Sequence, residues 1–337
     1  MVEAGFYEAI GGGKVRCFLC AHRCVIREGK RGICAVRENV GGRLYSLVYG
    51  KLVATHVDPI EKKPLFHFLP GSRSFSIATA GCNFRCEHCQ NYEISQFPRE
   101  RPEVGIPGMS MTPGDVISAA AAKGCRSISY TYTEPTIFLE FALDCARLAR
   151  ERGIRNVFVS NGFMTAESAA AIIPYLDADN IDLKGDERFY REICHARAAP
   201  VRETIRLMKE KGVWVEVTTL IIPGLNDSTD ILEDIAGFIR SVDPLMPWHV
   251  SQFYPVYRLL DRPPTPVATI KKARDIGLNA GLKHVYVGNV PHEAGEDTYC
   301  PSCGARVISR EGYIIRDMRL DKGVCPECSS AVSGVWD

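Results

Sequence analysis

Between residues 74 and 290 the chain alternates short β-branched, apolar runs with longer segments of helical pattern, and this alternation constrains the fold most strongly. The candidate strands lie at 74–80, 127–133, 156–160, 180–184, 213–221, 249–255 and 284–290. The candidate helices lie at 113–123, 136–152, 165–175, 200–211, 228–241 and 266–280. Strands that alternate with helices pair in parallel, because each helix carries the chain back along the sheet. We therefore expect an α/β fold on a parallel sheet.

Six strand–helix units are fewer than the eight of a closed barrel, so the pattern favours an incomplete (β/α)6 barrel. A doubly wound open sheet is the alternative, which the pattern alone does not separate from the barrel. In both folds the functional residues lie at the carboxyl ends of the strands, where this chain places Glu134, Asn161, Asp182 and Lys184.

The segments that flank this core lack the alternation, and each carries its own group of cysteines. We predict an N-terminal cysteine-rich metal-binding module at 1–70, a core domain at 71–295 and a small zinc-ribbon-like module at 296–337.

Charge and hydropathy restrict the partners. The formal net charge of +1 lacks the basic excess of a nucleic-acid-binding protein. No apolar run approaches the roughly 20 residues of a membrane span, and the first residues lack the apolar core of a signal peptide. We expect a cytoplasmic protein with no nucleic-acid or membrane partner. Because cytosolic thiols stay reduced, the 14 cysteines are better explained as metal ligands than as disulfides.

Most of these cysteines are clustered. The three groups are Cys17, Cys20, Cys24 and Cys34; Cys82, Cys86 and Cys89; and Cys300, Cys303, Cys325 and Cys328. Cys125, Cys145 and Cys194 stand alone, and we expect them to be core residues.

The central group, Cys82-x3-Cys86-x2-Cys89, directly follows the first core strand. A [4Fe–4S] cluster takes four thiolates, so three in one loop leave one iron open to a small molecule. A zinc ion completed by His88 or by a distant residue is the alternative, but zinc knuckles usually combine two Cys-x2-Cys pairs. We favour the cluster.

The C-terminal group consists of two Cys-Pro-x-Cys pairs, which predict a structural zinc ion held by four thiolates. A rubredoxin-like iron site with the same ligands is the alternative. The N-terminal group can saturate either zinc or an auxiliary [4Fe–4S] cluster, with His22 as an alternative donor. We favour zinc there, because zinc requires no redox role.

The string Cys-x3-Cys-x2-Cys after a first strand resembles the signature of the radical SAM superfamily, with Phe84 as its aromatic residue. The strings YTYTEPT, SNGF, NIDLKG, LIIPGLND and VYVGNVP resemble strand-end motifs of the branch that contains the pyruvate formate-lyase activating enzymes. With both flanking cysteine groups, the whole chain resembles the AmmeMemoRadiSam-system radical SAM enzymes. This resemblance implies a TIM-like radical SAM barrel, a [4Fe–4S] cluster at Cys82, Cys86 and Cys89, and S-adenosylmethionine (SAM) on its open iron.

The resemblance also places charged residues around SAM. Glu134 stands where family members hold the SAM ammonium, although Tyr132 and Thr133 replace the usual glycines. Asp182 and Lys184 share one strand face, because side chains alternate along a strand. Lys184 is expected to meet the carboxylate of SAM or substrate. The alternative for Asp182 and Lys184 is a structural ion pair.

Uncharged residues complete the expected SAM site. Ser160 and Asn161, with Asp182, supply oxygens for ribose hydroxyls or a cation, and His249 is expected near the ribose. Asn289 follows the strand expected to bind the adenine edge, although Gly288-Asn289 is also a common turn.

We therefore predict an oxidoreductase-type radical enzyme that cleaves SAM reductively to a 5′-deoxyadenosyl radical, which abstracts hydrogen from an unidentified substrate. We expect a flavodoxin- or ferredoxin-type electron donor, and the resemblance implies Amme- and Memo-type partners. Activation of a glycyl-radical enzyme is the alternative within the family. The alternatives outside it are a multi-cluster electron-transfer protein without SAM chemistry and a zinc-based nucleic-acid-binding or scaffold protein.

Overall fold

The computed structural model describes residues 1–290 and 295–337. Its largest element is an eight-stranded sheet of order β16-β15-β14-β13-β12-β11-β9-β8. The strands are β8 (Ala54–Pro59), β9 (Arg73–Ala78), β11 (Ser127–Tyr130), β12 (Arg155–Ser160), β13 (Ala178–Asp182), β14 (Trp214–Ile221), β15 (Trp248–Gln252) and β16 (Val285–Gly288). All seven strands that the sequence predicted are present.

The seven strands from β9 to β16 are parallel and neighbour one another in chain order. A doubly wound sheet requires a reversal of strand order. This order does not reverse, so right-handed crossovers place the connecting helices on one face, as in a barrel. The α/β fold is confirmed, as an open sheet with β16 and β8 at its edges.

A helix follows the strands at each of the six places where the sequence predicted one. They are α3 (Pro113–Ala122), α4 (Leu139–Glu151), α5 (Ala166–Ile172), α7 (Ala199–Glu210), α8 (Thr229–Val242) and α9 (Val267–Asn279). Thr112 and Thr165 form capping boxes, in which each hydroxyl accepts a hydrogen bond from the third helical residue. The sequence did not predict the short helices α1 (Tyr92–Ser95), α2 (Phe97–Glu100) and α6 (Glu187–Phe189), nor a π turn at Tyr190–Cys194.

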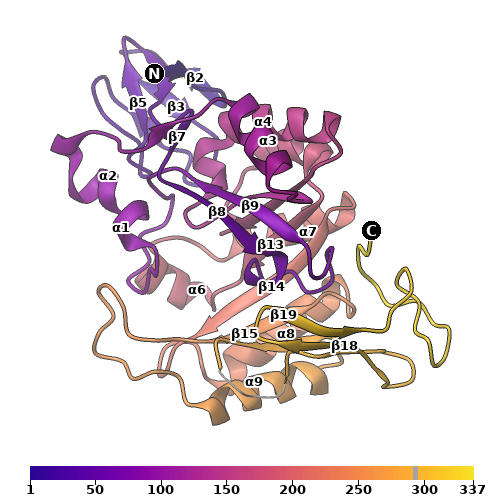
Figure 1. The fold of residues 1–337 in the computed structure, drawn as a ribbon. Coiled ribbons are helices and arrows are strands. Elements are labelled where there is room, and N and C mark those ends of the chain that lie inside the picture. The colour runs from indigo at the N-terminus through magenta and orange to yellow at the C-terminus, as the bar shows by residue number, and fades with distance from the viewer. Residues whose placement is uncertain (291–294) are drawn as a thin grey trace.

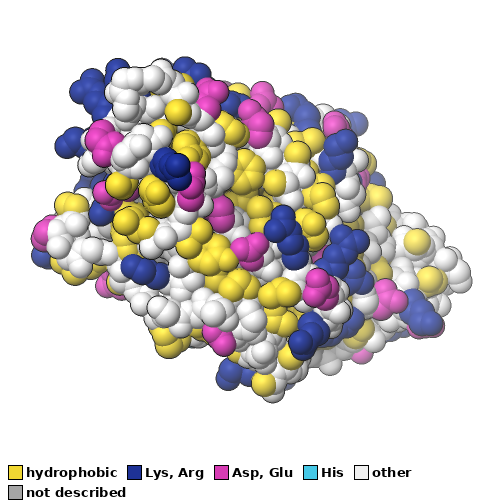
Figure 2. All heavy atoms as spheres, turned by 90° about the horizontal axis from the view of Figure 1, so that it is seen from above, with side chains coloured by type: hydrophobic (Ala, Val, Ile, Leu, Met, Phe, Trp, Pro, Cys, Tyr) yellow, Lys and Arg dark blue, Asp and Glu magenta, His cyan; other side chains and the backbone are white. Residues whose placement is uncertain are grey.

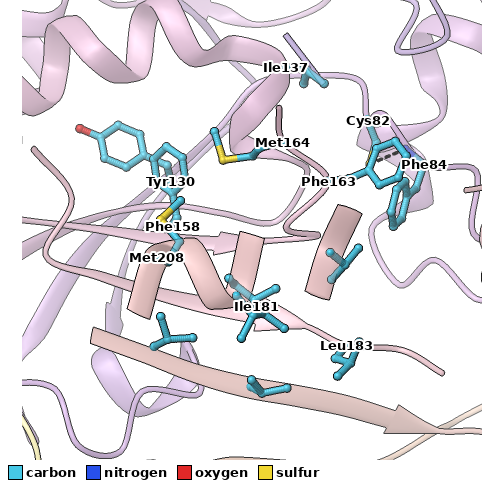
Figure 3. Packing of buried hydrophobic residues seen from close by; sticks show 14 of the residues in the cluster. Cys82, Phe84, Tyr130, Ile137, Phe158, Phe163, Met164, Ile181, Leu183 and Met208 are labelled. Carbon is cyan, nitrogen blue, oxygen red and sulfur yellow. Dashed lines mark hydrogen bonds between the residues drawn. The ribbon is translucent and has the colours of Figure 1, made fainter. Parts of the chain in front are cut away.

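The hydrophobic core between the sheet and the helices reaches the central cysteine loop. Figure 3 shows Tyr130, Phe158 and Met208 clustered in it, and Phe84 beside Phe163 near Cys82. The rings of Phe84 and Phe163 are 5.1 Å apart in an edge-to-face arrangement. Such aromatic pairs stabilise a fixed geometry, so the cysteine loop is anchored on the core.

Small antiparallel sheets flank the large one. The N-terminal strands are β1 (Val2–Glu3), β2 (Tyr7–Ala9), β3 (Val15–Cys17), β4 (Val25–Ile26), β5 (Arg37–Val40) and β6 (Arg43–Ser46), followed by β7 (Lys51–Leu52), which pairs with β10 (Met109–Ser110). The C-terminal strands are β17 (Thr298–Tyr299), β18 (Arg306–Glu311) and β19 (Ile314–Met318). The two sets lie at opposite ends of the molecule (Figure 1).

One strand crosses the expected boundary between the N-terminal module and the core. β8 lies within 1–70, yet it pairs antiparallel with β9 along its whole length and forms an edge of the large sheet. The division into 1–70, 71–295 and 296–337 stays a prediction, and its second boundary adjoins residues outside the described part.

The surface carries both signs of charge. Figure 2 shows Lys and Arg interspersed with Asp and Glu on the face that it presents. Among the described helices, none is both long enough and apolar enough to cross a bilayer.

Candidate functional site

A cavity of about 390 Å³ opens at the carboxyl ends of the parallel strands. Segments after β9, β11 and β16 contribute to its wall, as do residues of β12, β13, β14 and β15. Nine of the residues predicted to bind the cluster or SAM line it: Cys82, Phe84, Cys86, Cys89, Ser160, Asn161, Asp182, Lys184 and Asn289. His88, the alternative zinc ligand, lines it as well. The described part of VYVGNVP ends at Val290, and its Pro291 lies outside the described residues.

Backbone contacts hold the cysteine loop in place. Gly81 has φ +98°, and a Cβ there would lie 2.6 Å from Val36 Cγ1, so both conformation and space require glycine. Further along, the backbone N–H of Arg85 donates to Cys194 O at 3.2 Å, and that of Glu87 donates to Ile193 O at 3.0 Å. The π turn after β13 therefore braces the loop.

The three thiols fit an iron–sulfur cluster chemically. Burial raises the pKa of the Cys82 thiol, with a smaller contribution from Glu134. For Cys86 a hydrogen bond with Cys194 and burial raise the pKa, and burial raises that of Cys89. Buried thiols of this kind become thiolates by binding metal, since coordination displaces the proton.

The amide of Asn161 contacts the cysteine loop rather than open space. Its Nδ2 lies 3.5 Å from Cys82 Sγ and 3.2 Å from Asn83 Oδ1. Hydrogen bonds to ligand sulfurs tune the potential of an iron–sulfur cluster. The side chain that the sequence assigned to ribose thus contacts the thiol of Cys82, a predicted ligand.

Glu134 joins the ends of two strands. Its Oε2 accepts from the backbone N–H of Asn161 at 2.7 Å, and its Oε1 accepts from the backbone N–H (3.1 Å) and the hydroxyl of Thr136. Burial raises its pKa. The side chain does not line the cavity, and both oxygens already have donors. The geometry therefore supports a positioning role through Asn161.

Asp182 and Lys184 form an ion pair in the cavity wall, with Nζ and Oδ2 2.5 Å apart. Burial opposes the charge on Lys184, but Asp182 together with Cys86, Cys194 and Tyr190 outweighs burial and raises the lysine pKa. Beside them Ser160 donates to both carboxylate oxygens of Asp179. Asn289 adopts a left-handed conformation at φ 61°, which asparagine tolerates.

The structure does not bring His249 to the cavity. Its Nε2 lies 2.7 Å from Glu216 Oε2, and the rings of Phe66 and Tyr286 pack against the imidazole. Glu216 also accepts the backbone N–H groups of Phe66 and His67. His249 is part of a buried structural network behind the cavity.

Sequence reasoning missed a cationic group in the cavity wall. Lys62 and Lys63 both line the cavity, and both donate to Asp58 of β8, at 2.9 and 2.7 Å. Burial lowers the pKa of Lys63 to about 8. Tyr132, at φ +62°, donates its hydroxyl to Asp58 and places its ring 4.5 Å from Lys63 Nζ. No local motif marks Lys62 and Lys63, because they follow β8, which pairs with β9 from the side opposite to β11.

Tyr313 was also missed. It lies at the turn between β18 and β19 and reaches the cavity wall, although the chain separates it from the core strands. The same hairpin is fixed by Arg310, whose guanidinium carbon lies 4.4 Å above the Phe66 ring and whose Nη2 donates to Phe66 O. The C-terminal segment therefore narrows the cavity.

Cys194 lies beside Cys86, contrary to its expected isolation. Donor atoms of Cys86, His88 and Cys194 all lie within 4.8 Å of one another. Cys86 lines the cavity, whereas Cys194 does not. Cys194 therefore lies on the side of the cysteine loop that faces away from the cavity.

The C-terminal cysteines match one tetrahedral ion. Cys300 and Cys328 have their sulfurs 3.6 Å apart, and those of Cys303 and Cys325 are 3.7 Å apart. Four thiolates at the Zn–S bond length of about 2.3 Å place neighbouring sulfurs about 3.8 Å apart. These residues can hold a zinc ion.

Comparison with known proteins adds family evidence. The model of the family described as the radical SAM superfamily matches residues 76–238. An uncharacterized protein of Methanocaldococcus jannaschii is 48% identical, with 95% of each chain covered. A second protein of that organism, named as a glycyl-radical enzyme activating enzyme, is 27% identical over 55% of this chain and 75% of its own.

Among solved structures, SuiB of Streptococcus suis bound to S-adenosylmethionine is similar in fold. The TM-score is 0.51 at 12% identity, with 69% of this chain and 53% of SuiB covered.

Proposed function

The chain belongs to the radical SAM superfamily, and we propose that it binds a [4Fe–4S] cluster through Cys82, Cys86 and Cys89 and cleaves SAM reductively. When bound, these cofactors supply a 5′-deoxyadenosyl radical, which abstracts hydrogen from a substrate. The observation that carries the proposal is that all three thiols line one cavity with polar residues from the carboxyl ends of the strands.

Residues of this chain bind and orient the cofactors. Asn161 donates toward the sulfur of Cys82, and Glu134 fixes the backbone N–H of Asn161. Asp182 and Lys184 meet the charged ends of SAM or substrate from β13 and the residues after it. Phe84 excludes water from the ligand loop by packing on Phe163.

Ser160 and Asn289 also line the cavity. We assign Ser160 to the ribose of SAM and Asn289 to its adenine. His249 is left out of this set, because it bonds to Glu216 behind the cavity.

The shape of the cavity supports a small molecule or a single protein side chain as the hydrogen donor. Tyr313 from the C-terminal hairpin and the Lys62–Lys63 pair occupy part of its wall. A protein loop would need a more open groove. We include Amme- and Memo-type partners, with a flavodoxin- or ferredoxin-type electron donor, because the motif resemblance implies this multiprotein system.

The direct test is anaerobic reconstitution with iron and sulfide, followed by addition of SAM and dithionite. We expect continuing production of 5′-deoxyadenosine, measured by chromatography. A protein that carries the cluster yet forms no 5′-deoxyadenosine would instead be an electron carrier.

Activation of a glycyl-radical enzyme is the second candidate, favoured by the 27% identical relative that carries this name. Such activation leaves a stable glycyl radical on a partner protein. Electron paramagnetic resonance of the enzyme with a co-expressed neighbour would show the corresponding doublet, and that signal would replace the small-molecule proposal.

Exchange of Asp182 for Asn is expected to weaken SAM binding by about ten- to a hundredfold, since one charge-assisted hydrogen bond contributes about 1.5–3 kcal/mol. SAM titration of the reconstituted protein, followed by the cluster spectrum, measures the affinity. Asp234→Asn is the matched control, because Asp234 pairs with Arg202 on the surface of α8. Equal affinity in both variants would make the Asp182–Lys184 pair purely structural.

A further inference from the structure

The four N-terminal cysteines converge on one enclosed space. Cys17 ends β3, Cys20 and Cys24 lie in the following loop, and Cys34 precedes β5. All four line a cavity of about 10 Å³, together with apolar residues such as Leu19 and Ile26. The site is thus assembled, separate from the large cavity.

The spacing of the sulfurs distinguishes between one ion and a cluster. Thiolates on one zinc ion lie about 3.8 Å apart, and the four C-terminal sulfurs satisfy this, all lying within 4.8 Å of one another. Within residues 1–290, all described, no three of the N-terminal sulfurs come that close together.

The central cysteines behave like the N-terminal ones. In the described chain, the sulfurs of Cys82, Cys86 and Cys89 do not all lie within 4.8 Å of one another, although all three cysteines line one cavity. Ligands of a [4Fe–4S] cluster bind different irons, so their sulfurs lie farther apart than those around a single ion. By this internal comparison the N-terminal spacing corresponds to a cluster.

A buried charge faces the same space. Arg37 lines the thiol cavity and is only 1% exposed. Its Nη2 donates to Gly5 O and forms an ion pair with Glu140 Oε1. Its buried Nε and Nη1 have no hydrogen-bond partner. An arginine cannot lose its charge to relieve this. Unpaired cationic donors at the wall indicate an anionic occupant, such as a metal centre with four thiolates.

The N-terminal cysteine site contacts the loop that carries Cys82, Cys86 and Cys89, which we call the catalytic loop. Arg99 Nη2 donates both to Ile33 O at 2.6 Å and to Cys82 O at 3.3 Å. A Cβ on Gly81 would lie 3.0 Å from Cys34 O, so the two ligand segments are in backbone contact. His22 adds a third link, with its Nε2 2.9 Å from Asn83 O.

We propose that Cys17, Cys20, Cys24 and Cys34 hold an auxiliary [4Fe–4S] cluster, fully ligated by protein, that passes electrons to the catalytic site. The assignment replaces the zinc interpretation of the sequence, and its relay role rests on the proposed function. A ferredoxin-type donor reduces the auxiliary cluster by one electron. That electron moves to the cluster at Cys82, Cys86 and Cys89 without breaking a bond. SAM consumes it as the sulfonium C–S bond breaks to methionine and the radical.

Metal analysis of the Cys82→Ala/Cys86→Ala/Cys89→Ala variant tests the assignment independently of SAM chemistry. After anaerobic incubation with iron, sulfide and zinc, we expect about four iron and four sulfide and about one zinc per chain. The dithionite-reduced protein is expected to show a paramagnetic [4Fe–4S] signal that SAM does not change. Two zinc ions without iron, or no metal at the N-terminal cysteines, would overturn it.

If the variant fails to fold, the metal content of the wild-type chain tests the same assignment. We expect about eight iron and one zinc per chain, whereas a zinc-filled N-terminal site gives about four iron and two zinc. Iron bound in a chain that forms no 5′-deoxyadenosine would leave the assignment intact and refute only the proposed function.

The relay is tested with Cys20→Ala/Cys24→Ala and the matched control Cys125→Ala, which removes a thiol outside all three groups. With reduced ferredoxin, the first variant is expected to form 5′-deoxyadenosine no faster than without donor, while dithionite restores turnover. The dithionite arm shows that the catalytic site is intact. Equal rates with ferredoxin in both variants would exclude the relay.

Discussion

Replacement of Cys82, Cys86 and Cys89 together by Ala is expected to reduce 5′-deoxyadenosine formation to background. These are the thiols that line the cavity with Asp182 and Lys184. Without them the proposed cluster has no ligands in the cavity, so no electron reaches SAM and its sulfonium is not reduced. Chromatography of the anaerobic reaction with dithionite measures the loss.

The zinc content of the same variant separates the roles of the cysteine groups. We expect about one zinc per chain to remain at the C-terminal site. Loss of that zinc would show that the groups are not independent.

Cys194→Ala is the matched control for the triple replacement. Cys194 lies beside Cys86 but does not line the cavity. We expect this variant to keep both iron and SAM cleavage. If it loses iron as completely as the triple variant, Cys194 is a ligand and the assignment of three thiols is wrong.

Double replacement of Cys300 and Cys328 by Ser is expected to unfold the C-terminal segment selectively. Its apolar core contains five buried residues, of which two are themselves cysteines: Cys300, Val307, Ile308, Cys325 and Val332. So small a core does not stabilise a fold alone. Structural zinc binding contributes about 10–16 kcal/mol in comparable small sites, so its loss exceeds what the core supplies.

Hydrogen–deuterium exchange over 298–337 measures the effect, with zinc content determined on the same sample. Protection should fall there and persist in β9 to β15, whose core is separate. Exchange should also rise around Phe66, since Arg310 would leave its ring and carbonyl.

Glu327→Gln is the control for the zinc-site variant. It changes the same knuckle and removes only an exposed ion pair with Arg319, which typically contributes about 0–1 kcal/mol. Unchanged protection in a double variant proven free of zinc would mean that packing on the core, rather than metal, stabilises this segment.

The sequence by itself determined the strand–helix order and which cysteines are the candidate ligands. Both are local properties: a strand such as 127–133 is marked by its β-branched run, a helix by Thr112 at its N-cap, and a ligand loop by the spacing of Cys82, Cys86 and Cys89. Parallel pairing and a site at the carboxyl ends then follow from general rules of α/β folds.

Only the tertiary structure decided which side chains face the cavity. Asn161 and Glu134 lie at the ends of predicted strands, yet one contacts Cys82 and the other is enclosed by Thr136 and the backbone of Asn161. His249 has a strand position like that of Ser251, but only Ser251 lines the cavity. Periodicity gives the alternation of faces, whereas the partner of a polar side chain depends on neighbours from other strands.

The same limit applies to contacts between distant segments. Lys63 precedes the core strands in the sequence and Tyr313 follows them, yet both line the same cavity. The pairing of β8 with β9 brings Lys63 there, and the packing of the β18–β19 hairpin on Phe66 brings Tyr313 there. Cysteine spacing likewise left the N-terminal group open to zinc or a cluster, since four thiols along a chain do not define distances between sulfurs. The distances between the sulfurs depend on how β3, β5 and the catalytic loop pack, and these segments meet only in the folded chain.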